Sequence, residues 1–475
     1  MKNRKKTVIL EKITVEDYAA EGKSLARVDG KVIFIENAVP GDVVDVRLLK
    51  NKKDWAEAVP VNFQAFSPNR VTPFCTHFGV CGGCQWQMLP YEQQLVFKQK
   101  QVADNLQRIG KIPLPAIMPI IGCNETTGYR NKMEYTFSNK RFIPAEEFRR
   151  MLQEENGQQP LHQGFAGFHA KGVFDKVVEI DICHLQNEPT NQIRKAIAAF
   201  ALQNNVQFYD ARLHTGWLRN VLIRMSTTGE LMVNIVLGYE DEDLRNKLLE
   251  EILRQFTGIT TLLYTINTKK NDSYFDLEPQ VYFGKGYILD KLEDFIFKIS
   301  PKSFFQTNTR QAEKLYQVAR DFAGLTGEQV LYDLYCGTGS IGIFASRGTK
   351  KVVGVDVVAE AIADAGENAA LNNLLQAHFF AGDVIDICDD AFFAQNGKPD
   401  VVITDPPRAG MHEKLVTKLL DIAAPVVVYV SCNPATQARD LALLGEKYSV
   451  EKIQPVDMFP HTHHIENVVQ LKIKS

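Results

Sequence analysis

A cysteine stands at the end of a short apolar run near the C-terminus. The segment VVVYV (426–430) has the pattern of a buried strand, and Ser431, Cys432 and Asn433 follow it. A thiol in that place either fills the hydrophobic core or acts as a nucleophile at the edge of a sheet. Polar residues at other strand ends distinguish these two interpretations.

A glycine-rich turn follows an earlier apolar run. In DLYCGTGS (333–340), Gly337 allows a sharp turn and a close approach to a ligand. Asp356 ends the next strand pattern, where such folds place an acid that hydrogen-bonds a ribose. With its acid before the glycines, the pattern resembles the first motifs of S-adenosylmethionine-dependent methyltransferases. That resemblance implies that Asp383 holds the adenine, and a loop acid or helix cap is the alternative.

A further acid, Asp405, begins the segment DPPR (405–408) after the fourth strand pattern. Ligands bind at this carboxyl edge in open α/β sheets. Amino-nitrogen methylases carry a similar motif that ends in an aromatic residue, but Arg408 stands at that position here. The sequence therefore argues against methylation of an adenine amino group.

Cys432 is expected at the same edge, where a thiolate could activate a pyrimidine. Carbon-5 of a pyrimidine accepts a methyl group only after a nucleophile has added to carbon-6. A base must then remove the carbon-5 proton so that the thiol can leave. Glu466, at the start of the last strand pattern, is the expected base, and a partly exposed acid at a strand end is the alternative.

Three cysteines crowd into one loop-like stretch. The spacing Cys75-x5-Cys81-x2-Cys84 is typical of metal ligands in a reducing compartment. Four thiolates can hold either zinc or an iron–sulfur cluster, so the spacing leaves both open.

The secondary structure that the sequence predicts around these residues differs between three regions of the chain. From 301 to 475, apolar runs alternate with helical patterns, which predicts a doubly wound Rossmann-like α/β domain with a parallel sheet. Ala312, Leu315 and Tyr316 begin the apolar stripe of one such helix. Residues 1–65 show short strands and turns, as in a small oligonucleotide-binding-type β-barrel. Residues 66–300 are predicted to form a central α+β domain that carries the cysteines.

Composition narrows the protein class. The 475 residues are 45% hydrophobic and 23% charged, with a formal net charge of −3. The basic N-terminus leads into strand-like alternation rather than a signal-peptide core, and no apolar run is long enough for a membrane helix. We therefore expect a cytoplasmic protein without a membrane partner.

Five segments, in order, resemble the RNA uracil-5-methyltransferase family: SFFQTN, DLYCGTG, DPPR, SCNP and HIEN. The resemblance covers residues 300–475. It implies that Cys432 is the nucleophile and Glu466 the proton acceptor. It also implies that Gln306, Tyr335, Asp356 and Asp405 contact S-adenosylmethionine or uracil.

The resemblance extends to the other domains. The N-terminal barrel resembles a TRAM domain, which implies RNA binding. For the cysteines, the family resemblance implies Cys183 as fourth ligand and a [4Fe–4S] cluster, with zinc as the lesser alternative. The expected substrate is 23S ribosomal RNA. Transfer RNA and a catalytically inactive RNA-binding protein are the alternatives, and no obligate protein partner is implied.

Overall fold

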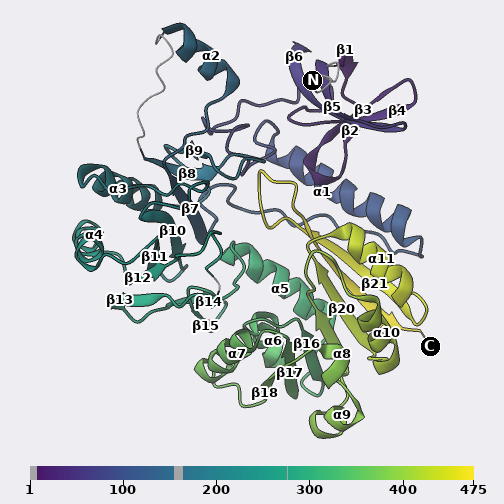
Figure 1. Ribbon diagram of the computed structural model, residues 1–475. Coiled ribbons are helices and arrows are strands. Elements are labelled where there is room, and N and C mark those ends of the chain that lie inside the picture. The colour runs from purple at the N-terminus through teal and green to yellow at the C-terminus, as the bar shows by residue number, and fades with distance from the viewer. Residues whose placement is uncertain (1–7, 155–163, 275, 475) are drawn as a thin grey trace. The chain divides into compact units, whose positions relative to one another are not determined.

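The computed structural model describes residues 8–154, 164–274 and 276–474. The chain divides into two compact units (Figure 1). The first unit comprises residues 1–126, 407–411 and 431–469, and the second comprises residues 127–406, 412–430 and 470–475. None of the helices in the described ranges is both long and apolar enough to cross a lipid bilayer.

The first unit begins with a small β-barrel of six strands in the order β1-β5-β6-β4-β3-β2. Its strands are β1 (Ile9–Thr14), β2 (Asp17–Tyr18), β3 (Ser24–Val28), β4 (Lys31–Ile35), β5 (Val43–Asn51) and β6 (Trp55–Ala65). Side chains of a strand point alternately to its two faces. In β5, accordingly, Val44 and Val46 are buried while Val43 and Arg47 are not. This alternation gives the barrel one apolar interior.

The first unit also contains elements from both ends of the chain. They are α1 (Tyr91–Asn105), a π-helical turn (Leu106–Gly110), α11 (Pro434–Leu444), β21 (Tyr448–Val456) and most of β22 (Glu466–Ile473). The π-helical turn follows α1 directly, so the helical path runs from Tyr91 to Gly110. In this unit α1 packs on α11.

The second unit contains a central seven-stranded sheet in the order β13-β12-β11-β10-β7-β8-β9. Its strands are β7 (Lys132–Ser138), β8 (Phe165–His169), β9 (Val177–Glu179), β10 (Leu218–Met225), β11 (Leu231–Leu237), β12 (Thr261–Ile266) and β13 (Gln280–Gly284). Helices α3 (Thr190–Gln203) and α4 (Glu242–Gln255) bury their apolar faces with this sheet in one core. The segment also holds α2 (Ala145–Glu154) and the hairpin β14 (Ile288–Leu292)–β15 (Phe295–Ile299).

The doubly wound sheet follows, as the alternating pattern predicts. Its strands are β16 (Val330–Leu334), β17 (Lys351–Asp356), β18 (Ala377–Ala381), β19 (Val401–Thr404) and β20 (Val426–Ser431). They are parallel in the order β18-β17-β16-β19-β20. The helices are α5 (Thr309–Ala323), α6 (Ser340–Ala345), α7 (Ala359–Leu371), α8 (Val384–Ile387), α9 (Asp390–Asn396) and α10 (Glu413–Ile422). The expected stripe of α5 is buried at Ala312, Leu315 and Tyr316.

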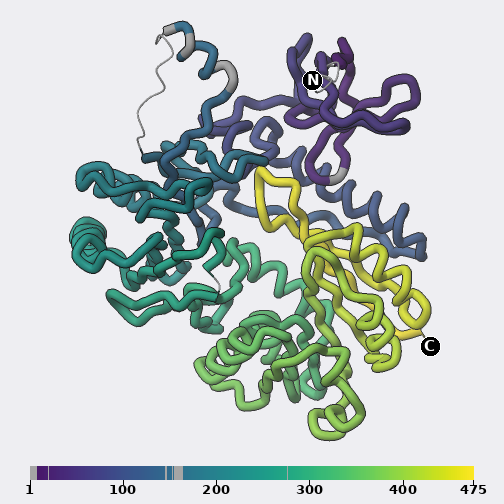
Figure 2. The backbone as a smooth tube through the Cα atoms, in the orientation of Figure 1, coloured from purple at the N-terminus to yellow at the C-terminus, as the bar shows by residue number. Residues whose placement is uncertain are grey.

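The last strand returns against the direction of the others. β22 is the neighbour of β20 and is followed in the sheet by β21. The backbone N–H of Ile473, at the end of β22, donates to the carbonyl of Pro425, just before β20, over 3.1 Å. β22 is therefore antiparallel to β20, and its first residue lies at the end where β20 finishes. Figure 2 traces this path, in which the loop 457–465 joins β21 to β22.

Candidate active site

Cys432 lies in the tight connection between β20 and α11, and its side chain is half-buried. The Asn433 side chain caps the helix by accepting from the N–H of Ala435 (3.1 Å), and Pro434 occupies the first helical turn. Asparagine caps and first-turn prolines both favour helix initiation. The proline that follows the cysteine therefore begins a helix, which leaves Cys432 at a strand end beside a helix N-terminus.

The loop 407–411, which follows Asp405, is fixed to α11. The Asn433 amide donates to the carbonyl of Arg408 (3.0 Å), and the buried carboxylate of Asp440 accepts from the N–H of Met411 (2.8 Å). Gly410 has a φ of 76°, and a Cβ there would stand 2.7 Å from Asp440. The cysteine turn and this loop thus form one hydrogen-bonded structure in the first unit.

Glu466 begins β22 and is 5% exposed. Its neighbour Asn467 forms a reciprocal amide pair with Gln437 of α11, with Nδ2–Oε1 at 2.7 Å and Nε2–O at 3.1 Å. Because β22 is antiparallel to β20, Glu466 and Cys432 lie at the same end of neighbouring strands. A thiol and a buried carboxyl group therefore lie at the same end of two neighbouring strands.

The glycine turn binds the acid of the next strand. The N–H of Gly337 donates to Asp356 Oδ2 over 3.0 Å, and the N–H of Val358 donates to Oδ1 over 2.9 Å. Tyr335 and Gly337 have φ angles of 61° and 53°. Left-handed backbone of this kind is costly for a tyrosine and is concentrated at functional sites.

A cavity of about 400 Å³ opens beside this turn within the second unit. It is lined by Tyr335, Val355, Asp356, Val357, Gly382, Asp383, Val384, Ile385, Asp386, His412 and Lys414. Its size suits a small organic cofactor. Asp383 lines the cavity and also caps α8 by accepting from the N–H of Ile385 (2.9 Å), so the helix cap is observed and the adenine contact stays a prediction.

Gln306, Gly337 and Asp405 do not line that cavity. The segment around Gln306 is held by Asn131, whose amide donates to the Gln306 carbonyl and to Thr309 Oγ1, both over 2.8 Å. Sequence reasoning missed Asn131, because nothing in the local pattern links residues so far apart in the chain.

Asp333 is a second residue whose role the sequence did not reveal. Its carboxyl group is buried, with Oδ2 accepting from the N–H of Gly342 (2.7 Å), and burial raises its pKa to about 8. Asp405 and Asp356 add to this shift by electrostatic repulsion. Burial also raises the pKa of Asp405. Desolvation therefore favours the protonated forms of Asp333 and Asp405.

Family models match most of these regions. The model described as tRNA (Uracil-5-)-methyltransferase matches residues 390–474, and the methyltransferase small domain matches residues 318–427. The TRAM domain model matches residues 7–61.

Relatives cover almost the whole chain. A Bacteroides thetaiotaomicron protein named "uncharacterized RNA methyltransferase" is 50% identical over 96% of this chain and 100% of its own. A Porphyromonas gingivalis protein of the same name is 48% identical over 96% and 98%. The chain belongs to the RNA uracil-5-methyltransferase family. It is an S-adenosylmethionine-dependent RNA (uracil-5-)-methyltransferase, as the sequence predicts.

A solved structure of this family supports the fold assignment. The Pyrococcus abyssi tRNA (uracil-54, C5)-methyltransferase in complex with S-adenosyl-L-homocysteine has a TM-score of 0.73 and 28% identity, covering 97% of this chain and 100% of that chain. The TRAM barrel and the doubly wound methyltransferase domain are confirmed.

The cysteine loop of this methyltransferase has some features of a metal site. The backbone N–H groups of Gly83 and Cys84 hydrogen-bond to the Cys81 side chain. Burial raises the pKa of the Cys81 thiol, and nearby Cys75 adds to that shift. Amide donors aimed at sulfur are typical of cluster-binding loops.

The described ranges nevertheless contain no group of three or more His, Cys, Asp or Glu side chains arranged to hold a metal ion. Cys75, Cys81 and Cys84 belong to the first unit and Cys183 to the second. The donor chemistry thus fits a cluster, while the complete ligand set remains a prediction.

Proposed function

We propose that this enzyme methylates carbon-5 of a specific uridine in 23S ribosomal RNA, in the cytoplasm, through a covalent intermediate on Cys432. The observation that supports the mechanism is that Cys432 and Glu466 lie at the same end of neighbouring strands. The N-terminus of α11 beside Cys432 also favours an anion there.

In the proposed reaction, the Cys432 thiolate forms a bond to carbon-6 of uracil, and the ring becomes an enolate with a nucleophilic carbon-5. When bound, S-adenosylmethionine supplies the electrophilic methyl group for carbon-5. Glu466 then accepts the carbon-5 proton. The electron pair of that C–H bond restores the C5–C6 double bond, the C6–S bond breaks, and Cys432 leaves as thiolate.

For the cofactor, the cavity beside the glycine turn supports specific roles. Asp356 is proposed to bind the ribose and Asp383 the adenine, with Tyr335 lining the cavity and the N–H of Gly337 orienting the Asp356 carboxylate. Asp405 and Gln306 are proposed to contact the cofactor or the uracil.

The mechanism is tested by trapping the intermediate. Glu466→Gln removes the base but keeps the size of the side chain, so methylation proceeds while elimination slows. We expect an SDS-resistant Cys432–RNA adduct that is absent in Glu466→Gln combined with Cys432→Ser. Normal turnover by Glu466→Gln without an adduct would remove Glu466 from the mechanism.

Transfer RNA is the second candidate substrate. It is favoured by the Pyrococcus abyssi enzyme, whose name states that it acts on transfer RNA. Ribosomal and transfer RNA from cells lacking this protein are digested separately, and 5-methyluridine is quantified by mass spectrometry. Loss from ribosomal RNA alone supports the proposal, and loss from transfer RNA alone replaces the substrate and keeps the chemistry.

We also propose that Cys75, Cys81, Cys84 and Cys183 hold a [4Fe–4S] cluster, with zinc as the alternative. The cluster would supply structural support for the RNA-binding region. We further propose three domains: the TRAM barrel at 1–65, the central domain with the cysteines at 66–300 and the methyltransferase domain at 301–475. Anaerobically purified enzyme should be brown and contain about four iron atoms per chain. Cys84→Ser should lose the colour, whereas Cys388→Ala should retain it. Zinc without iron in the native protein would contradict the cluster.

A further inference from the structure

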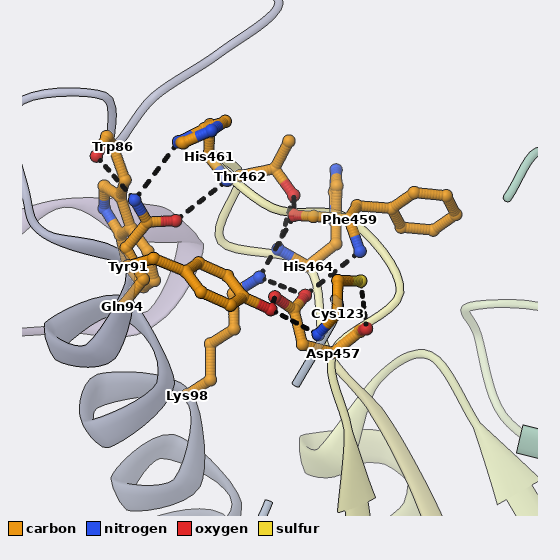
Figure 3. A network of polar contacts seen from close by, with 10 residues as sticks. All are labelled: Trp86, Tyr91, Gln94, Lys98, Cys123, Asp457, Phe459, His461, Thr462 and His464. Carbon is orange, nitrogen blue, oxygen red and sulfur yellow. Dashed lines mark hydrogen bonds and ion pairs between the residues drawn. The ribbon is translucent and has the colours of Figure 1, made fainter. Parts of the chain in front are cut away.

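The loop 457–465 leads directly into Glu466 and is anchored to α1 by a buried ion pair (Figure 3). Lys98 Nζ donates to Asp457 Oδ1 over 2.6 Å and to the carbonyl of Phe459 over 3.1 Å. The N–H of Phe459 donates to Asp457 Oδ1 over 3.0 Å. Both backbone polar groups of Phe459 are therefore fixed by this one ion pair.

Tyr91, two turns earlier on α1, completes the anchor. Its hydroxyl donates to Asp457 Oδ2 (2.8 Å) and accepts from the N–H of Cys123 (2.7 Å). The side chains of Lys98 and Asp457 are 0% exposed. A buried ion pair gives little net stability compared with apolar residues of similar size, but its hydrogen bonds fix geometry.

Gln94, also on α1, holds the same loop four residues further on. Its Oε1 accepts from the N–H of His461 (2.8 Å), and its Nε2 donates to the carbonyls of Trp86 (3.1 Å) and Leu89 (3.0 Å). The His461 carbonyl accepts from the N–H groups of Gln85 (2.8 Å) and Trp86 (3.0 Å). His461 has a φ of 64°, so these contacts hold a backbone conformation that is unfavourable by itself.

Further hydrogen bonds within the loop lie between His461 and Glu466, the proposed base. Thr462 Oγ1 donates to the Phe459 carbonyl (2.8 Å) and accepts from the N–H of His464 (3.3 Å). Ile465 is buried, and Glu466 follows it at the first position of β22. The loop therefore carries the fixed geometry from α1 to Glu466 within the first unit.

We propose that Lys98 and Gln94 are positioning residues for Glu466: they fix the loop 457–465 so that the Glu466 carboxylate meets the carbon-5 proton. The proposal rests on the proposed role of Glu466. Loosening the loop should slow resolution of the Cys432–uracil adduct more than its formation, since formation does not use Glu466.

The test compares the rates of adduct formation and adduct resolution in the full-length enzyme. In Lys98→Met combined with Asp457→Asn, the ion pair is removed without leaving a buried charge. We expect adduct formation within about two-fold of wild type and resolution at least tenfold slower, so that SDS-resistant adduct accumulates. Gln94→Met removes the acceptor of the His461 N–H. It should likewise lower the rate of adduct resolution relative to the rate of adduct formation.

Gln99→Met is the matched control. Gln99 also links α1 to backbone, through the Met118 carbonyl (3.2 Å) and the Ile120 N–H (2.7 Å), but outside this loop. It should leave the ratio of the two rates at the wild-type value. S-adenosylmethionine binding and thermal unfolding identify variants that have failed to fold.

Equal slowing of both steps in the Lys98/Asp457 and Gln94 variants would mean a structural role only and would overturn the proposal. The Glu466→Gln variant shows whether the positioning role has failed or whether Glu466 is not the base at all. If Glu466→Gln accumulates adduct and the loop variants do not, the positioning role alone is wrong. If Glu466→Gln turns over without adduct, Glu466 is not the base.

Discussion

At the scale of single residues, the acid before the glycine turn has an unusual charge state. Asp333 is enclosed by the sheet, and its carboxyl group has a pKa of about 8 because burial disfavours the anion. Asp405 and Asp356 reinforce the shift through repulsion. The protonated form is therefore the stable one at and below neutral pH.

This shift predicts a pH-dependent loss of stability. The pKa of Asp333 in the folded protein lies above the ordinary value near 3.9. Its contribution to the free energy of unfolding is therefore complete below about pH 4 and is lost as the pH rises through about 8. Each pKa unit corresponds to about 1.4 kcal/mol. Asp333→Asn should unfold at a temperature that falls less between about pH 5 and about pH 9 than that of wild type.

Thermal unfolding followed by circular dichroism across that range measures the effect. Asp321→Asn, an exposed acid on α5, should keep the wild-type pH dependence. Parallel curves for wild type and Asp333→Asn would show that Asp333 is already ionised in the fold.

At the scale of elements, α11 connects Cys432, the loop 407–411 and β22 within the first unit. Cys432 directly precedes its N-cap Asn433, its Asp440 side chain accepts from the Met411 N–H, and its Gln437 side chain binds Asn467 at the start of β22. One helix thus links the loop after Asp405 to the two residues that we propose as the reacting groups.

The Gln437–Asn467 pair is buried, which gives the second prediction. Gln437→Met keeps the length of the side chain but leaves the Asn467 carbonyl and amide without Gln437. An unsatisfied buried polar group costs about 1–3 kcal/mol, so the free energy of unfolding should fall by that amount. Denaturant unfolding measures it. Gln395→Met, at an exposed position of α9, should change it by less than about 0.5 kcal/mol, and an equally small effect of Gln437→Met would contradict the prediction.

At the scale of the whole molecule, the proposed cofactor cavity and a cluster of three lysines belong to different units. The cavity lies in the second unit, and Lys50, Lys52 and Lys53 are exposed at the end of β5 and in the turn after it in the first. Lys50 Nζ stands 4.8 Å from the centre of the Trp55 ring. We propose that these lysines contact RNA phosphates.

Changing all three lysines to glutamine should therefore weaken RNA binding without weakening cofactor binding. Each lost phosphate contact should reduce the slope of log affinity against log salt by about 0.7–0.9. RNA titrations at several salt concentrations give the slope, and calorimetry gives the S-adenosylmethionine affinity. An unchanged salt slope would exclude these lysines from the RNA interface.

The residue types at strand ends could be predicted because they follow local rules. Apolar runs followed by turns and helices identified the doubly wound domain, and the glycine turn with Asp356 predicted a cofactor site beside which the structure has a cavity. Pro434 is the first residue of α11, a position at which proline is favoured, and Cys432 lies between β20 and this helix.

By itself, then, the sequence determined the fold class, the family and the identities of the proposed reacting groups, since these depend on local pattern and residue chemistry. Only the tertiary structure decided that β22 runs antiparallel beside β20, which brings Glu466 to the end occupied by Cys432. Only the tertiary structure paired Lys98 with Asp457. Lys98 and Asp457 are 359 positions apart, and the order of the strands depends on how the whole sheet packs, so neither feature leaves a signal in any short segment.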